Sequence, residues 1–262
     1  MKTYLSQSIL SIQRCIILLF TAILFGSCLH LYYAPNSSNV PLFKEKGEAK
    51  INANYSGGAE ISGAEIQGAY AVSEHVGIML NTAFLGSSEE YSDGQKDEGN
   101  GYLVEAGAGY FMPLAENFIF ETYAGLGVGG ANNEYYYGGN SKVNFTKFFI
   151  QPALGFSVKN VDFGAASRFS AVFMNVQNTS GVNTIDLPDL QYIEANPTSI
   201  LWEPSLFVRF GFESVKAQLK YTPSLNLNNQ ELAQETYLLG LGLSFAINPP
   251  KNKTSRNGGA VQ

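Results

Sequence analysis

Residues 118–130 read Phe-Ile-Phe-Glu-Thr-Tyr-Ala-Gly-Leu-Gly-Val-Gly-Gly, and two kinds of side chain alternate along them. Every second position suits an apolar environment: Phe118, Phe120, Thr122, Ala124, Leu126 and Val128. The positions between them carry a carboxylate and mostly small side chains: Ile119, Glu121, Tyr123, Gly125, Gly127 and Gly129. A period of two is the signature of a β-strand, because successive side chains point to opposite faces. We therefore expect a strand with an outward apolar face and an inward small or polar face.

The same alternation recurs along most of the chain and predicts ten strands. They are expected at 48–56, 63–72, 76–85, 101–112, 118–131, 142–158, 161–176, 198–211, 214–223 and 235–247. Several of these runs exceed the usual five or six residues. A strand that crosses a bilayer at a tilt needs about 9–11 residues, so the predicted lengths suit a membrane barrel.

The connections between these strands alternate between short and long. The short ones are 73–75, 113–117, 159–160 and 212–213, and the long polar ones are 86–100, 132–141, 177–197 and 224–234. Short periplasmic turns and longer extracellular loops are typical of outer-membrane barrels. An even strand number places both ends of the barrel on the periplasmic side. We therefore predict an all-β fold, an antiparallel up-and-down transmembrane β-barrel of about ten strands in the cell outer membrane.

The composition excludes several classes of protein. Charged residues make up 15% of the chain, against about 25% in a typical soluble domain. The 27 glycines argue against a helix-rich enzyme, because glycine destabilises helices. A net charge of −6 provides no basic surface for nucleic acid. Two cysteines and two histidines leave little room for a zinc site or a Cys/His dyad, so no cofactor and no metal are expected.

The N-terminus has the features of an export signal. Lys2 and Arg14 precede an apolar run from Cys15 to Phe25, which is too short to span a bilayer comfortably. Residues 25–28, Phe-Gly-Ser-Cys, resemble a bacterial lipobox with Cys28 as the lipidated first residue of the mature chain. Phe25 departs from the usual leucine, and an ordinary signal peptide with an incidental cysteine is the alternative. A lipid on Cys28 is expected in the periplasmic leaflet, because the barrel ends are expected on that side.

These observations divide the chain into four parts. They are a lipoprotein signal peptide (1–27), a periplasmic linker (28–47), the β-barrel (48–247) and a flexible polar C-terminal tail (248–262).

The segment after Cys28 carries a family resemblance. Residues 33–36 (Tyr-Ala-Pro-Asn), 39–42 (Asn-Val-Pro-Leu) and 45–48 (Glu-Lys-Gly-Glu) lead directly into the first predicted strand. Together with residues 69–79, they resemble the start of a family of Bacteroidota outer-membrane β-barrel lipoproteins. Beyond these stretches the resemblance is one of strand pattern only. It implies a location and a fold, and no reaction.

Extending the inward face of residues 118–130 to every strand collects the charged side chains in the lumen. They are Lys50, Glu65, Glu105, Glu121, Lys147, Arg168, Glu203, Arg209, Lys216 and Lys220. A small barrel is filled by its own side chains, and a buried charge without a partner is costly. We expect a salt-bridge network that closes the barrel, with Glu105 and Glu121 facing Lys147 and Arg168. A narrow polar conduit that selects small solutes is the alternative.

The sequence gives no support for catalysis. His30 falls in the predicted linker and His75 in a predicted periplasmic turn, so neither is expected to supply a base among the outer loops. The acidic loop 86–100 lacks the spacing of an EF-hand calcium loop and is interpreted as solvated. Tyr70, Trp202 and Tyr221 are expected in an interfacial aromatic girdle, whereas residues 135–137 reach into an outer loop.

The resulting hypothesis is a non-enzymatic, lipid-anchored outer-membrane barrel. Its role would be envelope structure, adhesion by the outer loops or slow passage of small solutes. Its partners would be outer-membrane lipid and an extracellular ligand at the outer loops. The alternative is a soluble lipoprotein whose lipocalin-like closed β-barrel binds a small ligand. A membrane barrel needs an apolar band about 25 Å tall on its outer face, whereas a soluble barrel carries its charges outward.

Overall fold

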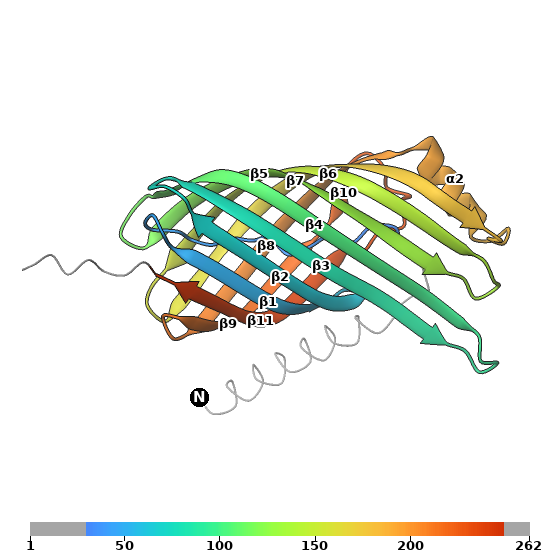
Figure 1. The fold of residues 1–262 in the computed structure, drawn as a ribbon, viewed down its shortest axis with the longest axis horizontal. Helices are drawn as coiled ribbons and strands as arrows, with labels where there is room; N and C mark the ends of the chain where they lie inside the picture. The colour runs from blue at the N-terminus through green and yellow to red at the C-terminus, as the bar shows by residue number, and fades with distance from the viewer. Residues whose placement is uncertain (1–29, 249–262) are drawn as a thin grey trace, which may run out of the picture.

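The computed structural model describes residues 30–248, and these form a closed antiparallel β-barrel (Figure 1). The predicted fold class is confirmed. The ten barrel strands are β1 (Ala49–Gly57), β2 (Ser62–Ala71), β3 (Val76–Glu90), β4 (Lys96–Pro113), β5 (Phe118–Glu134), β6 (Asn140–Ser157), β7 (Val161–Ser180), β8 (Thr198–Gly211), β9 (Val215–Pro223) and β11 (Tyr237–Ile247). The helix α2 (Leu187–Ala195) and the two-residue strand β10 (Leu225–Asn226) lie in connections. No helix within 30–248 is long and apolar enough to cross a membrane.

The barrel closes without a free edge. Each strand from β1 to β9 pairs with the next along the chain, β9 pairs with β11, and β11 returns to β1. The closing register sets Lys50 opposite Ala246 and Ser56 opposite Gly240. Closure gives every wall strand a hydrogen-bonded neighbour on both sides, so that none lies at a sheet edge with unpaired N–H and C=O groups along its whole length.

The two faces of the wall follow the predicted alternation. On β5, Leu126 and Val128 are about half exposed (55% and 52%), whereas Ile119 and Glu121 are fully buried. Large apolar side chains are exposed on the outer face of every barrel strand, including Ile51, Ile66, Phe84, Phe148, Leu206 and Leu241. Tyr70, Trp202 and Tyr221 are also partly exposed on this face. The outside of the barrel is therefore apolar and rich in aromatic residues.

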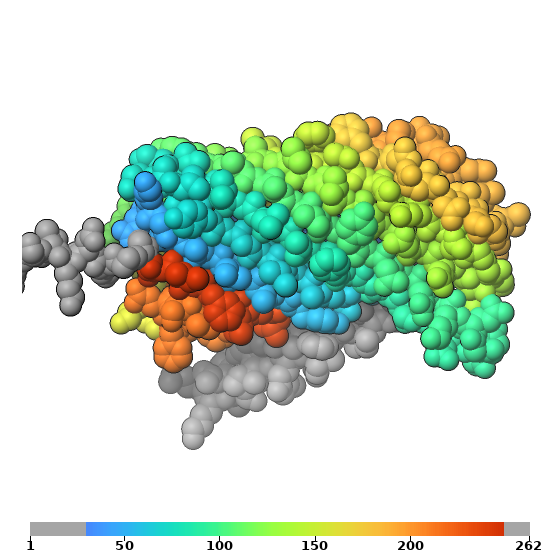
Figure 2. Space-filling model, in the orientation of Figure 1, coloured from blue at the N-terminus to red at the C-terminus, as the bar shows by residue number. Residues whose placement is uncertain are grey.

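The rim formed by the long connections is uneven in height. β3 and β4 stay paired as far as Glu90 and Lys96, so most of the predicted loop 86–100 is strand. The end of this hairpin, coloured teal, projects at one end of the molecule (Figure 2). β5 and β6 likewise stay paired as far as Glu134 and Asn140. The sequence pattern missed these extensions because strand pairing uses backbone groups and continues after the side-chain alternation ends. The connection 58–61 between β1 and β2 is much lower, because β2 begins opposite Gly86 of β3.

The segment 30–48 passes through the barrel, with residues 32–43 inside it and Lys44, Glu45 and Lys46 exposed at its end, whereas a periplasmic linker was predicted over 28–47 (Figure 1). Of its residues, Tyr33, Asn36, Ser37, Asn39, Val40 and Phe43 are almost completely buried. The physical reason is that polar wall side chains turned into a lumen need partners, and this segment supplies them. We call it the threaded segment. The predicted signal peptide, Cys28 and nearly all of the predicted tail lie outside the described residues.

Candidate functional site in the barrel lumen

A buried cluster of four charges occupies the middle of the lumen. Lys147 Nζ lies 3.2 Å from Glu105 Oε1 and 3.1 Å from Glu203 Oε2. Arg168 Nη1 lies 3.5 Å from Glu105 Oε2. All four side chains are fully buried. They come from β4, β6, β7 and β8, with β5 between the first two, and the alternation had identified their inward positions.

The threaded segment completes this cluster. The Asn36 amide donates to Glu105 Oε2 at 2.7 Å, and its oxygen accepts from Arg168 Nη1 at 2.7 Å. The Tyr33 hydroxyl donates to Glu203 Oε1 at 2.6 Å and accepts from Lys147 Nζ at 2.9 Å. Each of these two side chains therefore links an acid to a base. The charge cluster belongs jointly to the wall and to the segment.

Glu121 does not join this cluster, contrary to the predicted grouping of Glu105 and Glu121 with Lys147 and Arg168. Its carboxylate accepts the backbone N–H of Phe43 at 2.9 Å. Lys147 is opposite Gly127 in the β5–β6 register, six residues along β5 from Glu121. Six residues of strand span about 20 Å, so the two charges lie at different depths in the barrel. The alternation indicates which face of the wall a residue occupies, but its depth in the barrel follows from the stagger between strands.

The other predicted lumen charges contact the segment or a near neighbour. Glu65 accepts the Ser37 N–H and hydroxyl at 2.7 Å each. Lys220 donates to the Ser38 carbonyl at 3.2 Å and to Gln67 at 2.6 Å. Arg209 donates to the Val40 carbonyl at 2.9 Å.

Two predicted lumen lysines pair locally instead. Lys216 lies 2.6 Å from Asp162, and Lys50 lies 3.6 Å from Glu48. Both pairs are outside the central cluster. The predicted salt-bridge network is therefore divided into separate groups of contacts, most of which involve the threaded segment.

Apolar side chains of the threaded segment pack against apolar side chains and against a glycine on the inner face of the wall. Val40 and Leu42 pack with Ile119, Ala153, Ala166 and Phe207, and Phe43 packs with Phe111, Tyr123 and Phe149. A Cβ atom at Gly155 would lie 2.4 Å from Leu42 Cδ2, so only glycine leaves room for Leu42 there. Leu42 itself has a positive φ of 57°, a conformation that a leucine rarely adopts. The inner face of the wall and the threaded segment therefore have complementary shapes at this place.

The segment runs the full length of the barrel. At one end, Gly47 donates its N–H to the carbonyl of Ala71, beside the short turn between β2 and β3. At the other end, His30 Nε2 lies 2.5 Å from Asp97, and Nδ1 lies 3.4 Å from Asp186. Asp97 is in the tall β3–β4 hairpin and Asp186 precedes α2 in the β7–β8 connection. The segment therefore enters at the long-loop rim and leaves at the short-turn rim.

His30 corrects the expectation that no histidine lies among the outer loops. It joins two of them, and its ring lies 4.3 Å from that of Tyr135. Both ring nitrogens face carboxylates, so neither is free to take a proton from a nucleophile. We interpret His30 as the residue that attaches the N-terminal end of the threaded segment to two of the outer loops. Within residues 30–248, no group of three or more His, Cys, Asp or Glu side chains is placed to hold a metal ion.

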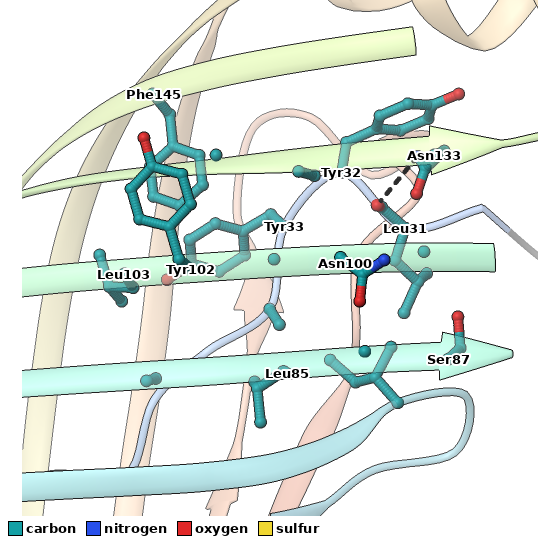
Figure 3. Close-up of a pocket in the computed structure, with 18 residues that line it drawn as sticks. Leu31, Tyr32, Tyr33, Leu85, Ser87, Asn100, Tyr102, Leu103, Asn133 and Phe145 are labelled. Atoms are coloured by element: carbon teal, nitrogen blue, oxygen red, sulfur yellow. Dashed lines mark hydrogen bonds between the residues drawn. The ribbon is translucent and has the colours of Figure 1, made fainter. Parts of the chain in front are cut away.

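A narrow crevice separates the segment from the wall near the long-loop rim (Figure 3). Leu31 and Tyr33 form one side of it, and Leu85, Leu103 and Phe145 form the other. Its volume is about 50 Å³, whereas pockets for small organic ligands measure roughly 300–1,000 Å³. A more polar opening of about 240 Å³ adjoins it, lined by His30, Glu60, Ser87, Ser88, Glu89, Asp97, Gly99 and Asn133.

The outer loops carry a cluster of tyrosines. The ring of Tyr136 lies 4.4 Å from that of Tyr91 and 4.8 Å from that of Tyr137. The Tyr136 hydroxyl donates to Asp93 at 2.6 Å, which lowers the pKa of that carboxyl group. Tyr135 was also expected in an outer loop, but it is buried and bonds Tyr32 and Ser141. The cluster thus joins the tips of the β3–β4 and β5–β6 hairpins.

Sequence reasoning missed Tyr33, Asn36, Ser37 and Phe43 as lumen residues. The segment has no regular period, and its Pro, Asn and Ser residues suit a linker equally well. One signal was present. Residues 40–43, Val-Pro-Leu-Phe, are apolar, and a linker in water would leave them exposed.

No protein-family model and no curated protein matches this chain. Among solved structures, it is similar to Ail, the attachment invasion locus protein of Yersinia pestis (12% identity, 77% of this chain, 99% of that chain, TM-score 0.37). It is also similar to the porin NanC (11% identity, 75% and 98%, TM-score 0.29) and to CdiB from Acinetobacter baumannii (7% identity, 78% and 60%, TM-score 0.22). Identities and TM-scores are low, so function is argued from this chain's own residues.

Proposed function

We propose that the protein is a lipid-anchored outer-membrane β-barrel that is closed to solutes, performs no catalysis and acts at its long-loop rim. The apolar outer face supports the location. Leu126, Phe148 and Leu241 are each half or more exposed, which would be unfavourable for a whole barrel surface in water. In the hydrocarbon core of a bilayer, exposure of the same apolar side chains is not unfavourable.

The single observation that carries the closed state is the threaded segment. Its residues fill the lumen and form hydrogen bonds with Glu65, Glu105, Arg168 and Glu203. Opening a conduit would require the segment to leave and these buried charges to lose partners. We therefore favour envelope structure or adhesion over passage of small solutes.

Bilayer recordings of the purified full-length protein test the closed state. We expect no steady conductance from protein that shows heat-modifiable gel mobility, the property of a folded barrel. Steady channels with that folded protein would contradict the closed state and support the polar conduit instead.

The soluble lipocalin-like alternative predicts an apolar cavity inside and charges outside. The buried inward side chains here include Gln67, Glu105, Gln151 and Arg168, and the crevice near Tyr33 is small. Membrane fractionation separates the two hypotheses. We expect the protein in the outer-membrane fraction and resistant to extraction by urea and carbonate, and its release in soluble form would refute the membrane hypothesis.

Adhesion is a second candidate role, favoured by the tyrosine cluster at the hairpin tips. Tyr137 is 67% exposed, and Tyr136 is held by Asp93. Exposed, ordered aromatic rings are suited to binding a protein or carbohydrate surface. Cells that display Tyr136→Ala/Tyr137→Ala should adhere less to surfaces coated with protein or carbohydrate than cells with the unaltered barrel at equal surface abundance. Equal adhesion would argue against this role.

A further inference from the structure

We propose that the lipid on Cys28 is anchored in the outer leaflet, on the side of the long loops, and that the barrel closes around the threaded segment. This inference rests on the proposed lipid-anchored membrane barrel. It replaces the expectation that the lipid lies in the periplasmic leaflet, which followed from strand parity alone.

The direction of the threaded segment carries the argument. Going backward from β1, the chain leaves the wall at the short-turn rim, where Gly47 bonds Ala71. It then passes the levels of Phe43, Asn36 and Tyr33 and reaches the long-loop rim at His30. An even number of strands determines on which side of the membrane β1 begins. It does not determine on which side the chain before β1 lies. One additional crossing through the lumen reverses the side of the N-terminus.

The reach of the chain fixes the leaflet. Only Leu29 separates Cys28 from His30, and these two residue steps span at most about 7 Å. The hydrocarbon core is about 30 Å thick, so a lipid on Cys28 cannot reach the opposite leaflet from this rim.

The shape of the rim supplies a route from the lumen to the membrane. The polar opening beside His30 is bounded by Asp97 on the tall hairpin and by Glu60 in the low β1–β2 connection. Beneath that connection, the outward side chains Tyr55 and Ile66 are 65% and 57% exposed. Apolar outer surface thus begins only a few residues below the low rim. A lipid attached next to the opening can enter the membrane there without crossing the tall wall.

The packing of the lumen implies an order of assembly. Arg168 and Lys147 of the wall and Tyr33 of the threaded segment are among the largest fully buried side chains, so the lumen is filled where the segment passes. A lipid-bearing end could not pass through this filled space after closure. The strands must therefore close while the segment is already in place, with the last strand pairing formed around it.

Epitope accessibility on cells tests the direction. A short epitope inserted between Leu29 and His30 should bind antibody on intact cells as strongly as the same epitope inserted at Gly94 in the β3–β4 turn. The matched control is the epitope at Asn160 in the short β6–β7 turn, which should bind only after permeabilisation. All three proteins should keep heat-modifiable mobility and incorporation of a fatty-acid analogue.

The accessibility of the three epitopes distinguishes a wrong direction of threading from a wrong orientation of the barrel. If the Gly94 epitope is accessible and the Leu29–His30 epitope needs permeabilisation, threading in this direction is wrong while the membrane barrel stands. If only the Asn160 epitope is accessible, the barrel is inverted and the lipid is not in the outer leaflet. Loss of heat-modifiable mobility or of membrane fractionation in the unaltered protein would instead refute the proposed function on which this inference rests.

Discussion

Asn36, which belongs to no strand, accepts a hydrogen bond of 2.7 Å from the guanidinium of Arg168 on β7. The same side chain donates to Glu105, so it takes part in a charge cluster that the wall alone would leave incomplete. The threaded segment therefore acts as a structural element of the barrel.

Replacing Asn36 by Leu should destabilise the barrel markedly. The variant keeps the branched shape of the side chain but removes one hydrogen bond to each of three buried charges, Glu105, Arg168 and Lys147. Hydrogen bonds to charged groups contribute about 1.5–3 kcal/mol. The temperature at which folded gel mobility is lost should fall clearly. Asn178→Leu, at an exposed position on β7, is the control and should change it little. Equal effects would mean that the Asn36 contacts do not stabilise the fold.

Two buried glutamates should differ in their response to the same change. Glu105→Gln removes the charge that faces both Lys147 and Arg168, and breaking a buried ion pair costs about 3–5 kcal/mol. Glu121→Gln keeps an acceptor for the Phe43 N–H and should cost far less. Denaturant unfolding in detergent measures both. A larger loss for Glu121→Gln would contradict the separation of Glu121 from the central cluster.

The face assignment predicts a further comparison on β5. Glu121→Ala leaves the buried Phe43 N–H without its acceptor, which costs about 1–3 kcal/mol. Phe120→Leu keeps apolar bulk on the outer face and should cost less. The loss of folded gel mobility on heating ranks the two variants. If Phe120→Leu is the more damaging, the inner and outer faces have been exchanged.

The fit between Leu42 and Gly155 predicts a rescue. Gly155→Ala places a Cβ in the space of Leu42, where the nearest atom is 2.4 Å away, and should weaken folding. Leu42→Ala leaves a cavity and should also weaken folding. The double variant should be more stable than the sum of the two single effects predicts, because each change makes room for the other. Strict additivity would show that the segment does not occupy this place.

Cysteine labelling tests the orientation of the wall. With a membrane-impermeant maleimide on whole cells, Ser92→Cys and Ser180→Cys should react, whereas Asn160→Cys should not. Ser92 lies in the β3–β4 turn, Ser180 ends β7, and Asn160 lies in a short turn. Reaction of Asn160→Cys in intact cells would overturn the orientation.

Lipidation is tested at Cys28 itself. Cys28→Ser should abolish labelling with a fatty-acid analogue and alter processing of the precursor. The barrel of the variant should still fold, because the threaded segment keeps its own contacts, among them that of His30 with Asp97. Unchanged labelling would refute the lipobox interpretation.

The sequence by itself determined the strands and the face that each side chain occupies. Phe120 and Glu121 are neighbours on opposite faces because the strand period of two is a local property of the backbone. The long alternating runs therefore predicted a barrel of about ten strands and the inward position of Glu105, Lys147, Arg168 and Glu203 without any knowledge of tertiary contacts.

Only the tertiary structure decided which of these charges meet and where the N-terminal segment lies. The stagger between strands separates Glu121 from Lys147 by depth, and no local pattern records that stagger. The position of residues 30–48 depends on the closed lumen, whose polar walls exist only after ten distant strands have paired. An irregular, polar stretch has no hydrophobic periodicity from which its position could be predicted. Its position depends on the hydrogen-bond partners that line the lumen once the barrel has closed.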